Sequence, residues 1–284
     1  MNILVATDFS TRSFRALRQA GLLAQAGGQL HVLHVVDDDQ PADLVRIETR
    51  EAERVLREQI ASVPELGGVD AHVLVVEGDS FDGILRSARD IAADLIVMGA
   101  HRRQLLDIFT GTTIERVIRK GTVPVLMVNN EAQRTYEKVV AAVDMSEASA
   151  NALRAGLSTG LITSEGATLV HAFPAWAKGK MYIAGADPAA IAKYVDDERR
   201  NASDELTEFL VDNNLGGPRW TVRLQEGEAT DVISRVVSDV RADLLIMGTH
   251  GRSGLLKALI GSVTEQALRY LSVDILAVPR SGNP

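Results

Sequence analysis

The same series of motifs occurs twice in this chain, and this duplication restricts its fold more than any other feature. Ala6-Thr7-Asp8-Phe9-Ser10 returns as Ala142-Val143-Asp144-Met145-Ser146. Ala93-Asp94-Leu95-Ile96-Val97-Met98-Gly99 returns as Ala242-Asp243-Leu244-Leu245-Ile246-Met247-Gly248. Each repeat has the length of one ordinary domain. We therefore predict two domains of the same fold, over residues 1–130 and 137–284, joined by a polar linker at 129–134.

The repeats differ in length mainly between His171 and Glu226, which correspond to His34 and Glu77. We assign the extra length to an insert around residues 174–181, which contains Trp176. An insert at this place could act as a lid over a site, but we expect a surface excursion.

Each repeat alternates apolar runs with segments of helical spacing. In the first repeat the sequence predicts strands near 2–7, 29–36, 69–76, 94–98 and 124–128, and helices near 11–27, 42–62, 79–92 and 111–120. Continuous Val, Ile and Leu runs are typical of parallel strands buried on both faces. We predict an α/β chain of two doubly wound domains, each a five-stranded parallel sheet of order 3-2-1-4-5 with helices on both faces.

In such a sheet a ligand binds beyond the carboxyl ends of the strands, where the strand order reverses. Here that point lies between the first and fourth strands, which end at Asp8 and Gly99 in one repeat and at Asp144 and Gly248 in the other. The most distinctive residues of each repeat are thus expected to meet at the predicted crevice.

The second repeat carries a glycine-rich loop between its fourth strand and its last helix. Gly248 would admit a ribose, Gly251 would leave room for phosphate, and Gly261 would open the helix. The N–H groups of Gly261, Ser262 and Val263 would then face phosphate oxygens, helped by the helix dipole. The pattern lacks the lysine of a Walker A loop, although Arg252 and Lys257 are candidates for phosphate contacts.

Other residues of the second repeat have two readings each. Asp144 would accept a ribose hydroxyl or hold a magnesium ion that bridges to phosphates, or it simply begins the next helix beside Ser146. Backbone near Ala172 would read an adenine edge, with Val143 against the base. His250 is either a loop contact or solvated, and His34 and His171 fit packing better than ligation. The six histidines lack metal-ligand spacing, and no nucleophile–base pair stands out.

The first repeat departs from this loop. Arg102 stands where the second repeat has Gly251, Arg103 follows, and one loop position is missing, although Asp8, Gly99, Gly111 and Thr112 remain. We expect this half to bind nucleotide weakly or not at all and to act as a structural partner. The alternative is that the arginines hold a different anion.

The composition of the chain excludes some classes of partner and of chemistry. The formal net charge of −8 argues against nucleic acid. The chain has no cysteine, so disulfides and thiol chemistry are excluded. No apolar run reaches membrane-spanning length and the first residues already read as a strand. We expect a cytoplasmic protein.

With these motifs the chain resembles a tandem universal stress protein over nearly its whole length. The resemblance rests on the motif around Asp8, the motif around Asp144 and the loop Gly248-x2-Gly251-x9-Gly261-Ser262. The resemblance implies that ATP, ADP or AMP binds in the C-terminal domain, with Mg as a candidate companion of the phosphates, and that the first domain, which lacks the middle glycine, does not bind nucleotide well. The site that the resemblance and the loop together imply comprises Val143, Asp144, Ala172, Met247, Gly248, His250, Gly251, Arg252, Gly261, Ser262, Val263 and Thr264.

Family members commonly pair through the fifth strand. By this resemblance 124–128 and 274–278 would pair within one chain as a pseudo-dimer, which would remove two exposed edges. Pairing of two chains as a homodimer stays open.

Three functions remain at this stage. The first is a regulatory adenine-nucleotide-binding protein in stress response, without catalytic residues. The second is a slow ATPase or adenine-nucleotide hydrolase that uses Asp144. The third is an interaction scaffold whose ligand, not a nucleotide, binds in the first repeat. Fold alone does not separate them.

Overall fold

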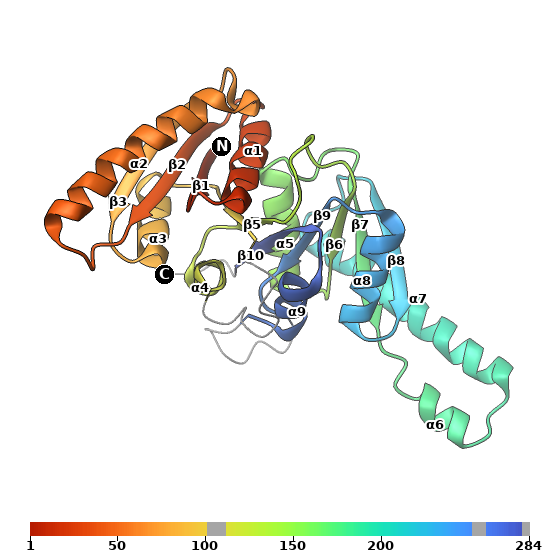
Figure 1. The fold of residues 1–284 in the computed structure, drawn as a ribbon. Coiled ribbons are helices and arrows are strands. Elements are labelled where there is room, and N and C mark those ends of the chain that lie inside the picture. The colour runs from red at the N-terminus through yellow and green to blue at the C-terminus, as the bar shows by residue number, and fades with distance from the viewer. Residues whose placement is uncertain (101–111, 252–259, 280–284) are drawn as a thin grey trace.

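The computed structural model describes residues 1–100, 112–251 and 260–279 of the chain. Within them the two repeats form two α/β halves that share one sheet (Figure 1). The predicted residues Arg102, Arg103, Gly111, Arg252 and Lys257 lie outside the described residues.

The elements of the first half follow the predicted alternation closely. In chain order they are β1 (Asn2–Ala6), α1 (Thr11–Ala24), β2 (Gln29–Val36), α2 (Ala42–Ser62), the short 3-10 helix η1 (Pro64–Leu66), β3 (Asp70–Glu77), α3 (Ser80–Asp90), β4 (Leu95–Gly99), α4 (Thr113–Lys120) and β5 (Val125–Val128).

The second half repeats this order with one added helix. Its elements are β6 (Val139–Ala142), α5 (Glu147–Ser158), β7 (Ala167–Phe173), α6 (Lys178–Ile183), α7 (Pro188–Asp212), β8 (Trp220–Glu226), α8 (Ala229–Val240), β9 (Leu244–Gly248), α9 (Ser262–Tyr270) and β10 (Asp274–Val278).

The described strands form a single sheet in the order β3-β2-β1-β4-β5-β10-β9-β6-β7-β8. Each half therefore has the predicted order 3-2-1-4-5, and its own neighbours pair in parallel. β5 pairs antiparallel with β10, with Leu126 opposite Leu276. The predicted pairing of the fifth strands within one chain is confirmed.

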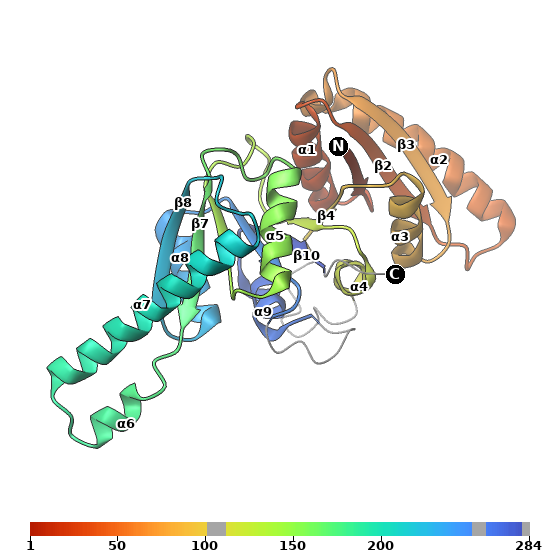
Figure 2. The same ribbon diagram turned by 180° about the vertical axis from the view of Figure 1, so that it is seen from behind.

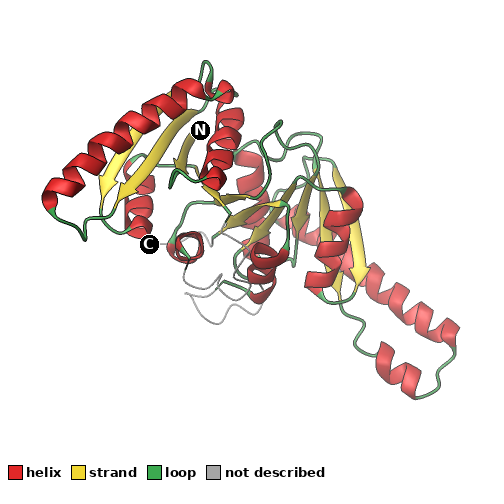
Figure 3. Cartoon of the chain, viewed as in Figure 1, coloured by secondary structure: helices red, strands yellow, loops and turns green. Residues whose placement is uncertain are grey.

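Helices cover both faces of this sheet, and each face carries a core that runs through both halves (Figure 3). Because successive side chains of a strand point to opposite faces of the sheet, Ile3 and Val5 belong to one core and Leu4 to the other. Leu17 of α1 and Leu153 of α5 belong to the first core. The second core contains residues of α3, α4, α8 and α9. The fold is therefore a three-layer structure whose two main cores are shared by both halves.

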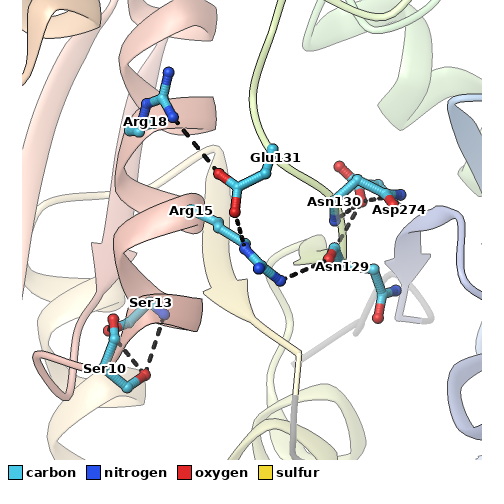
Figure 4. Close-up of polar contacts among 8 residues, drawn as sticks. All are labelled: Ser10, Ser13, Arg15, Arg18, Asn129, Asn130, Glu131 and Asp274. Carbon is cyan, nitrogen blue, oxygen red and sulfur yellow. Dashed lines mark hydrogen bonds and ion pairs between the residues drawn. The ribbon is translucent and has the colours of Figure 1, made fainter.

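The segment after β5 is bonded into the junction rather than being the free polar linker that the sequence predicts. Asp274 of β10 accepts hydrogen bonds from the backbone N–H groups of Asn129 and Asn130 at 2.8 and 3.0 Å and from the Tyr136 hydroxyl at 2.7 Å. Glu131 forms ion pairs with Arg15 and with Arg18 of α1 (Figure 4). The polar residues that suggest a linker in the sequence thus form hydrogen bonds and ion pairs across the junction.

Asp274 is only 3% exposed. Burial raises its pKa above the usual range, although hydrogen bonds from the Tyr136 hydroxyl and from Asn129 and Asn130 work in the opposite direction. A buried carboxylate thus joins the two halves beside the β5–β10 pair.

The insert of the second half forms helix α6 and the first turns of α7. In two opposite views these two helices project from the body of the molecule beyond β8 (Figures 1 and 2). Among the described residues, no helix is long and apolar enough to cross a membrane.

Candidate functional site

A cavity of about 550 Å³ opens at the carboxyl ends of β6, β7 and β9, at the predicted reversal of strand order. Ligand sites of small molecules commonly measure roughly 300–1,000 Å³. Of the predicted site residues, the structure places these around it: Val143, Asp144, Ala172, Met247, Gly248, His250, Gly251, Gly261, Ser262, Val263 and Thr264. Arg252 is outside the described residues.

The Asp144 carboxylate lies at one wall of the cavity and also organises the start of α5. Its Oδ1 accepts hydrogen bonds from the backbone N–H of Ser146 at 3.1 Å and from the Ser149 hydroxyl at 2.8 Å. Ser146, not Asp144, is the N-cap of α5, and Met145 between them has a left-handed φ of 56°. The two readings of Asp144 are therefore compatible: one oxygen anchors the turn while the residue lines the cavity.

The end of β7 forms a second wall. The His171 ring places Nδ1 2.7 Å from the carbonyl oxygen of Val143, and His34 makes the same contact with Thr7 at 2.8 Å in the first half. Both histidines thus tie the second strand of a half to its first, as expected for packing residues. Ala172 and Phe173 follow His171 along the same wall.

Gly248 has a structural role that the sequence does not show. A Cβ built on it would lie 2.8 Å from the carbonyl oxygen of Ala148 in α5. In the first half a Cβ on Gly99 would lie 2.6 Å from the backbone of Arg12. Helix packing alone therefore requires glycine at this position in both repeats, and the approach of a ribose to Gly248 stays a prediction.

Gly251 is different, because nothing in the backbone requires it. Its φ is outside the left-handed region, and a Cβ on it would meet only Asp144, with Oδ2 at 2.8 Å. The absence of a side chain at 251 therefore lets the Asp144 carboxylate lie close to the loop backbone at the cavity. This glycine is the one that the first repeat replaces with arginine.

The N-terminus of α9 faces the cavity. Its N-cap is Gly261, and no side chain of the described residues caps the helix. The predicted role of the Gly261 N–H is wrong, because that group donates to the Thr249 carbonyl at 2.7 Å. Thr264 is also engaged, since its hydroxyl donates to the Gly248 carbonyl at 2.7 Å. Ser262 and Val263 remain as the residues of the first turn that can present N–H groups to an anion.

The first half has a smaller cavity, of about 410 Å³, at the equivalent place. Asp8 lines it, and although burial opposes its ionisation, hydrogen bonds from Ser10 and Ser13 outweigh that effect and lower its pKa. The corresponding helix end carries a side-chain cap, because Thr112 accepts a hydrogen bond from the Glu115 N–H at 3.3 Å, which satisfies one N–H group of the first turn of α4. The two halves therefore differ in how much of a helix N-terminus they offer.

Trp176 of the insert and four residues of α7 also line the larger cavity, and sequence reasoning did not include them in the site. The contributing residues are Trp176, Glu198, Asn201, Ala202 and Glu205. The prediction of a surface excursion describes the outer part of α6 and α7 but not this inner part. The position of the extra length, directly after the strand that carries Ala172, was the available signal.

The described residues contain no group of three or more His, Cys, Asp or Glu side chains that could hold a metal ion. Any magnesium here would need oxygen ligands from the bound molecule in addition to Asp144.

Comparison with known proteins gives a consistent result for both halves. The profile of the Universal stress protein family matches residues 1–129 and again 135–279. Universal stress protein E of Escherichia coli K12 is 26% identical over 301 residues, which cover 98% of this chain and 93% of that protein.

Solved structures share the fold across the whole chain. A universal stress protein from Archaeoglobus fulgidus superimposes with a TM-score of 0.71 at 20% identity, covering 98% of each chain. A putative universal stress protein from Pseudomonas aeruginosa gives 0.64 at 21% identity, covering 99% of this chain and 93% of that one. The arrangement of two such halves in one chain is thus found in other proteins.

Proposed function

Because this chain belongs to the universal stress protein family, as the match over both halves establishes, we propose that it is a regulatory protein that binds ATP or another adenine nucleotide in the cavity of its C-terminal half. Binding of nucleotide would order this end of the molecule and so change what it presents to partner proteins. A cytoplasmic location fits this role.

The observation that carries the proposal is the uncapped N-terminus of α9 at the cavity, next to a loop residue without a side chain. The helix dipole and the N–H groups of the first turn favour an anion at Ser262 and Val263. Gly251 leaves the approach open. Phosphate groups are anions of suitable size and charge for such a helix end.

The rest of the cavity suits a nucleoside. Asp144 lies between the phosphate end and the end of β7, where its carboxylate can accept hydrogen bonds from ribose hydroxyls. Val143 and Met247 supply apolar surface, and the backbone at Ala172 can hydrogen-bond to a base edge. This division into a polar end and an apolar end matches the two ends of an adenine nucleotide.

The first half is proposed to be the structural partner rather than a second nucleotide site. Thr112 already caps α4, and Arg102 stands at the position that Gly251 has beside the other cavity. One nucleotide per chain is the expected stoichiometry.

We propose binding rather than turnover. A general base must reach the attacking water directly or through one water. Oδ1 of Asp144 already accepts hydrogen bonds from Ser146 and Ser149, which suits a residue that orients a ribose or a bound cation. Slow ATP hydrolysis is the alternative, and it would be favoured if Asp144→Ala removed turnover while nucleotide affinity was retained.

The test is calorimetric titration with ATP, ADP and AMP, with and without Mg²⁺. We expect saturation near one nucleotide per chain, and loss of binding in Gly251→Arg, which gives the second repeat the residue of the first. Gly217→Arg is the matched control, because Gly217 is exposed and a side chain there meets nothing within 4 Å. No uptake by the wild type at millimolar nucleotide would refute the proposal.

A further inference from the structure

The inner end of the insert is fixed against the sheet. Lys178, the first residue of α6, places Nζ 2.9 and 2.7 Å from the two carboxylate oxygens of Glu226, the last residue of β8. The backbone N–H of Ala177 donates to the Tyr194 hydroxyl of α7 at 3.2 Å. These contacts on the residues directly after Trp176 hold this aromatic side chain near the carboxyl ends of the strands.

Trp176 contributes to the cavity although 80% of its surface is exposed. It follows Phe173 and Pro174, which line the same part of the wall beyond the end of β7. β6 lies between β7 and β9 in the sheet, and β9 leads into the loop before α9. Trp176 is thus at the end of the cavity away from the helix that is proposed to bind phosphate.

The first repeat has nothing similar at this place. When His34 is matched to His171, the positions of Pro174, Ala175 and Trp176 fall on Asp37, Asp38 and Asp39. None of these three residues lines the smaller cavity. The repeat with the open helix end is therefore also the repeat with an aromatic ring at the opposite end.

We propose that Trp176 binds the base of the nucleotide: its indole stacks on the adenine ring, and the insert exists to present it. Stacking of a nucleobase on an aromatic side chain is favourable and does not require a rigid pocket. An exposed ring held by its neighbours can cover a base as the base enters. This inference rests on the proposed function, since it assigns a residue to the base end of the same site.

The first experiment compares ATP with inorganic tripolyphosphate, which has the phosphates but no base. Trp176→Ala should weaken ATP binding roughly tenfold, within the range measured for single base–aromatic stacks, and leave tripolyphosphate binding unchanged. Trp176→Phe should recover most of the ATP affinity. Tyr182→Ala is the matched control, because Tyr182 is an equally exposed aromatic residue of the insert, 79% accessible, that does not line the cavity.

The second experiment uses intrinsic fluorescence, because the chain has only two tryptophans. Trp220 begins β8, and its indole N–H donates to the Leu215 carbonyl at 2.7 Å. It lies at the amino end of that strand, whereas the cavity is at the carboxyl end. ATP should therefore quench emission in the wild type and in Trp220→Phe, but not in Trp176→Phe.

The outcomes separate the two proposals. If the wild type binds ATP but Trp176→Ala binds it equally well, the stacking role is refuted and the proposed function stands. An equal loss of ATP and tripolyphosphate affinity in Trp176→Ala would also refute the stacking role, because Trp176 would then affect the binding of the phosphates as well as that of the base. If the wild type binds neither compound, both proposals fail.

Discussion

The two glycines of the fourth-strand loop should behave differently when each is changed to alanine. Gly248→Ala places a methyl group 2.8 Å from the Ala148 carbonyl oxygen, where ordinary contacts begin at 3.4 Å. The obstructing atom is backbone of α5, a helix that packs on β9 and β10, so the clash is relieved only by moving the helix away from the sheet. Overpacking of this kind costs about 1–3 kcal/mol, so we expect the free energy of unfolding to fall by about 2 kcal/mol.

Gly251→Ala brings its methyl group to the same distance, 2.8 Å, but from the Asp144 carboxylate. The backbone at 251 is not left-handed, and a side chain yields more easily than helix backbone, but moving this carboxylate strains the hydrogen bonds that its Oδ1 accepts from Ser146 and Ser149. We expect a loss of stability of about 1 kcal/mol, smaller than for Gly248→Ala, together with weaker nucleotide binding.

Urea unfolding without nucleotide, followed by circular dichroism, measures the first quantity, and calorimetric titration measures the second. Gly99→Ala extends the comparison to the half that is not proposed to bind nucleotide, and it should destabilise the protein as Gly248→Ala does. The reasoning is refuted if Gly248→Ala unfolds at the wild-type urea concentration, or if Gly251→Ala is the less stable of the two.

Three further predictions concern the junction and the helix ends. Asp274→Ala leaves the Tyr136 hydroxyl and two backbone N–H groups without their acceptor. At about 1–3 kcal/mol for each unsatisfied group, we expect the free energy of unfolding in urea to fall by about 3 kcal/mol. A fall below about 1 kcal/mol would contradict the structure. Burial, with the nearby Asp274 carboxylate, raises the pKa of Tyr136 well above 10, so the contribution of Tyr136 to folding stability should be constant below pH 10 and decline as the pH rises above it. Tyr136→Phe should flatten that decline in alkaline unfolding curves, and an unchanged slope would exclude the assignment. Thr112→Ala removes a cap and should cost about 1 kcal/mol. Ser262→Pro removes one proposed N–H donor at the first helical position, where proline is tolerated, and should lower nucleotide affinity without changing the urea midpoint. The reverse pattern would contradict the difference between the two helix ends.

The sequence was a good guide wherever a local pattern decides the structure. Apolar runs and helical spacing located the strands and helices of the first half to within a few residues, because buried parallel strands and amphipathic helices need those patterns. Duplication then implied two halves of the same fold, and the strand order was taken from the doubly wound arrangement. The candidate site could be predicted to the same extent, because the carboxyl ends of the strands must meet at the reversal of order.

Sequence reasoning failed where a residue's neighbours come from a distant part of the chain. Gly248 is required by α5, and the Gly261 N–H is taken by Thr249, so neither role can be read from the loop alone. The residues at 129–134 read as a linker because nothing in the sequence shows that Asp274 accepts their hydrogen bonds. Trp176 was assigned to a surface excursion because its nearness to the cavity depends on Lys178 reaching Glu226.

Periodicity and repetition along the chain were thus sufficient to determine two α/β halves and the strand ends at which a ligand would bind. The tertiary structure decided which polar groups are already satisfied and which remain for a ligand. In this structure the first turn of α9 has no side-chain cap at the larger cavity, whereas Thr112 caps the first turn of α4. The physical reason is that a hydrogen-bonding group can serve a ligand only if the fold has not already used it, and its competing partners lie far away in the sequence.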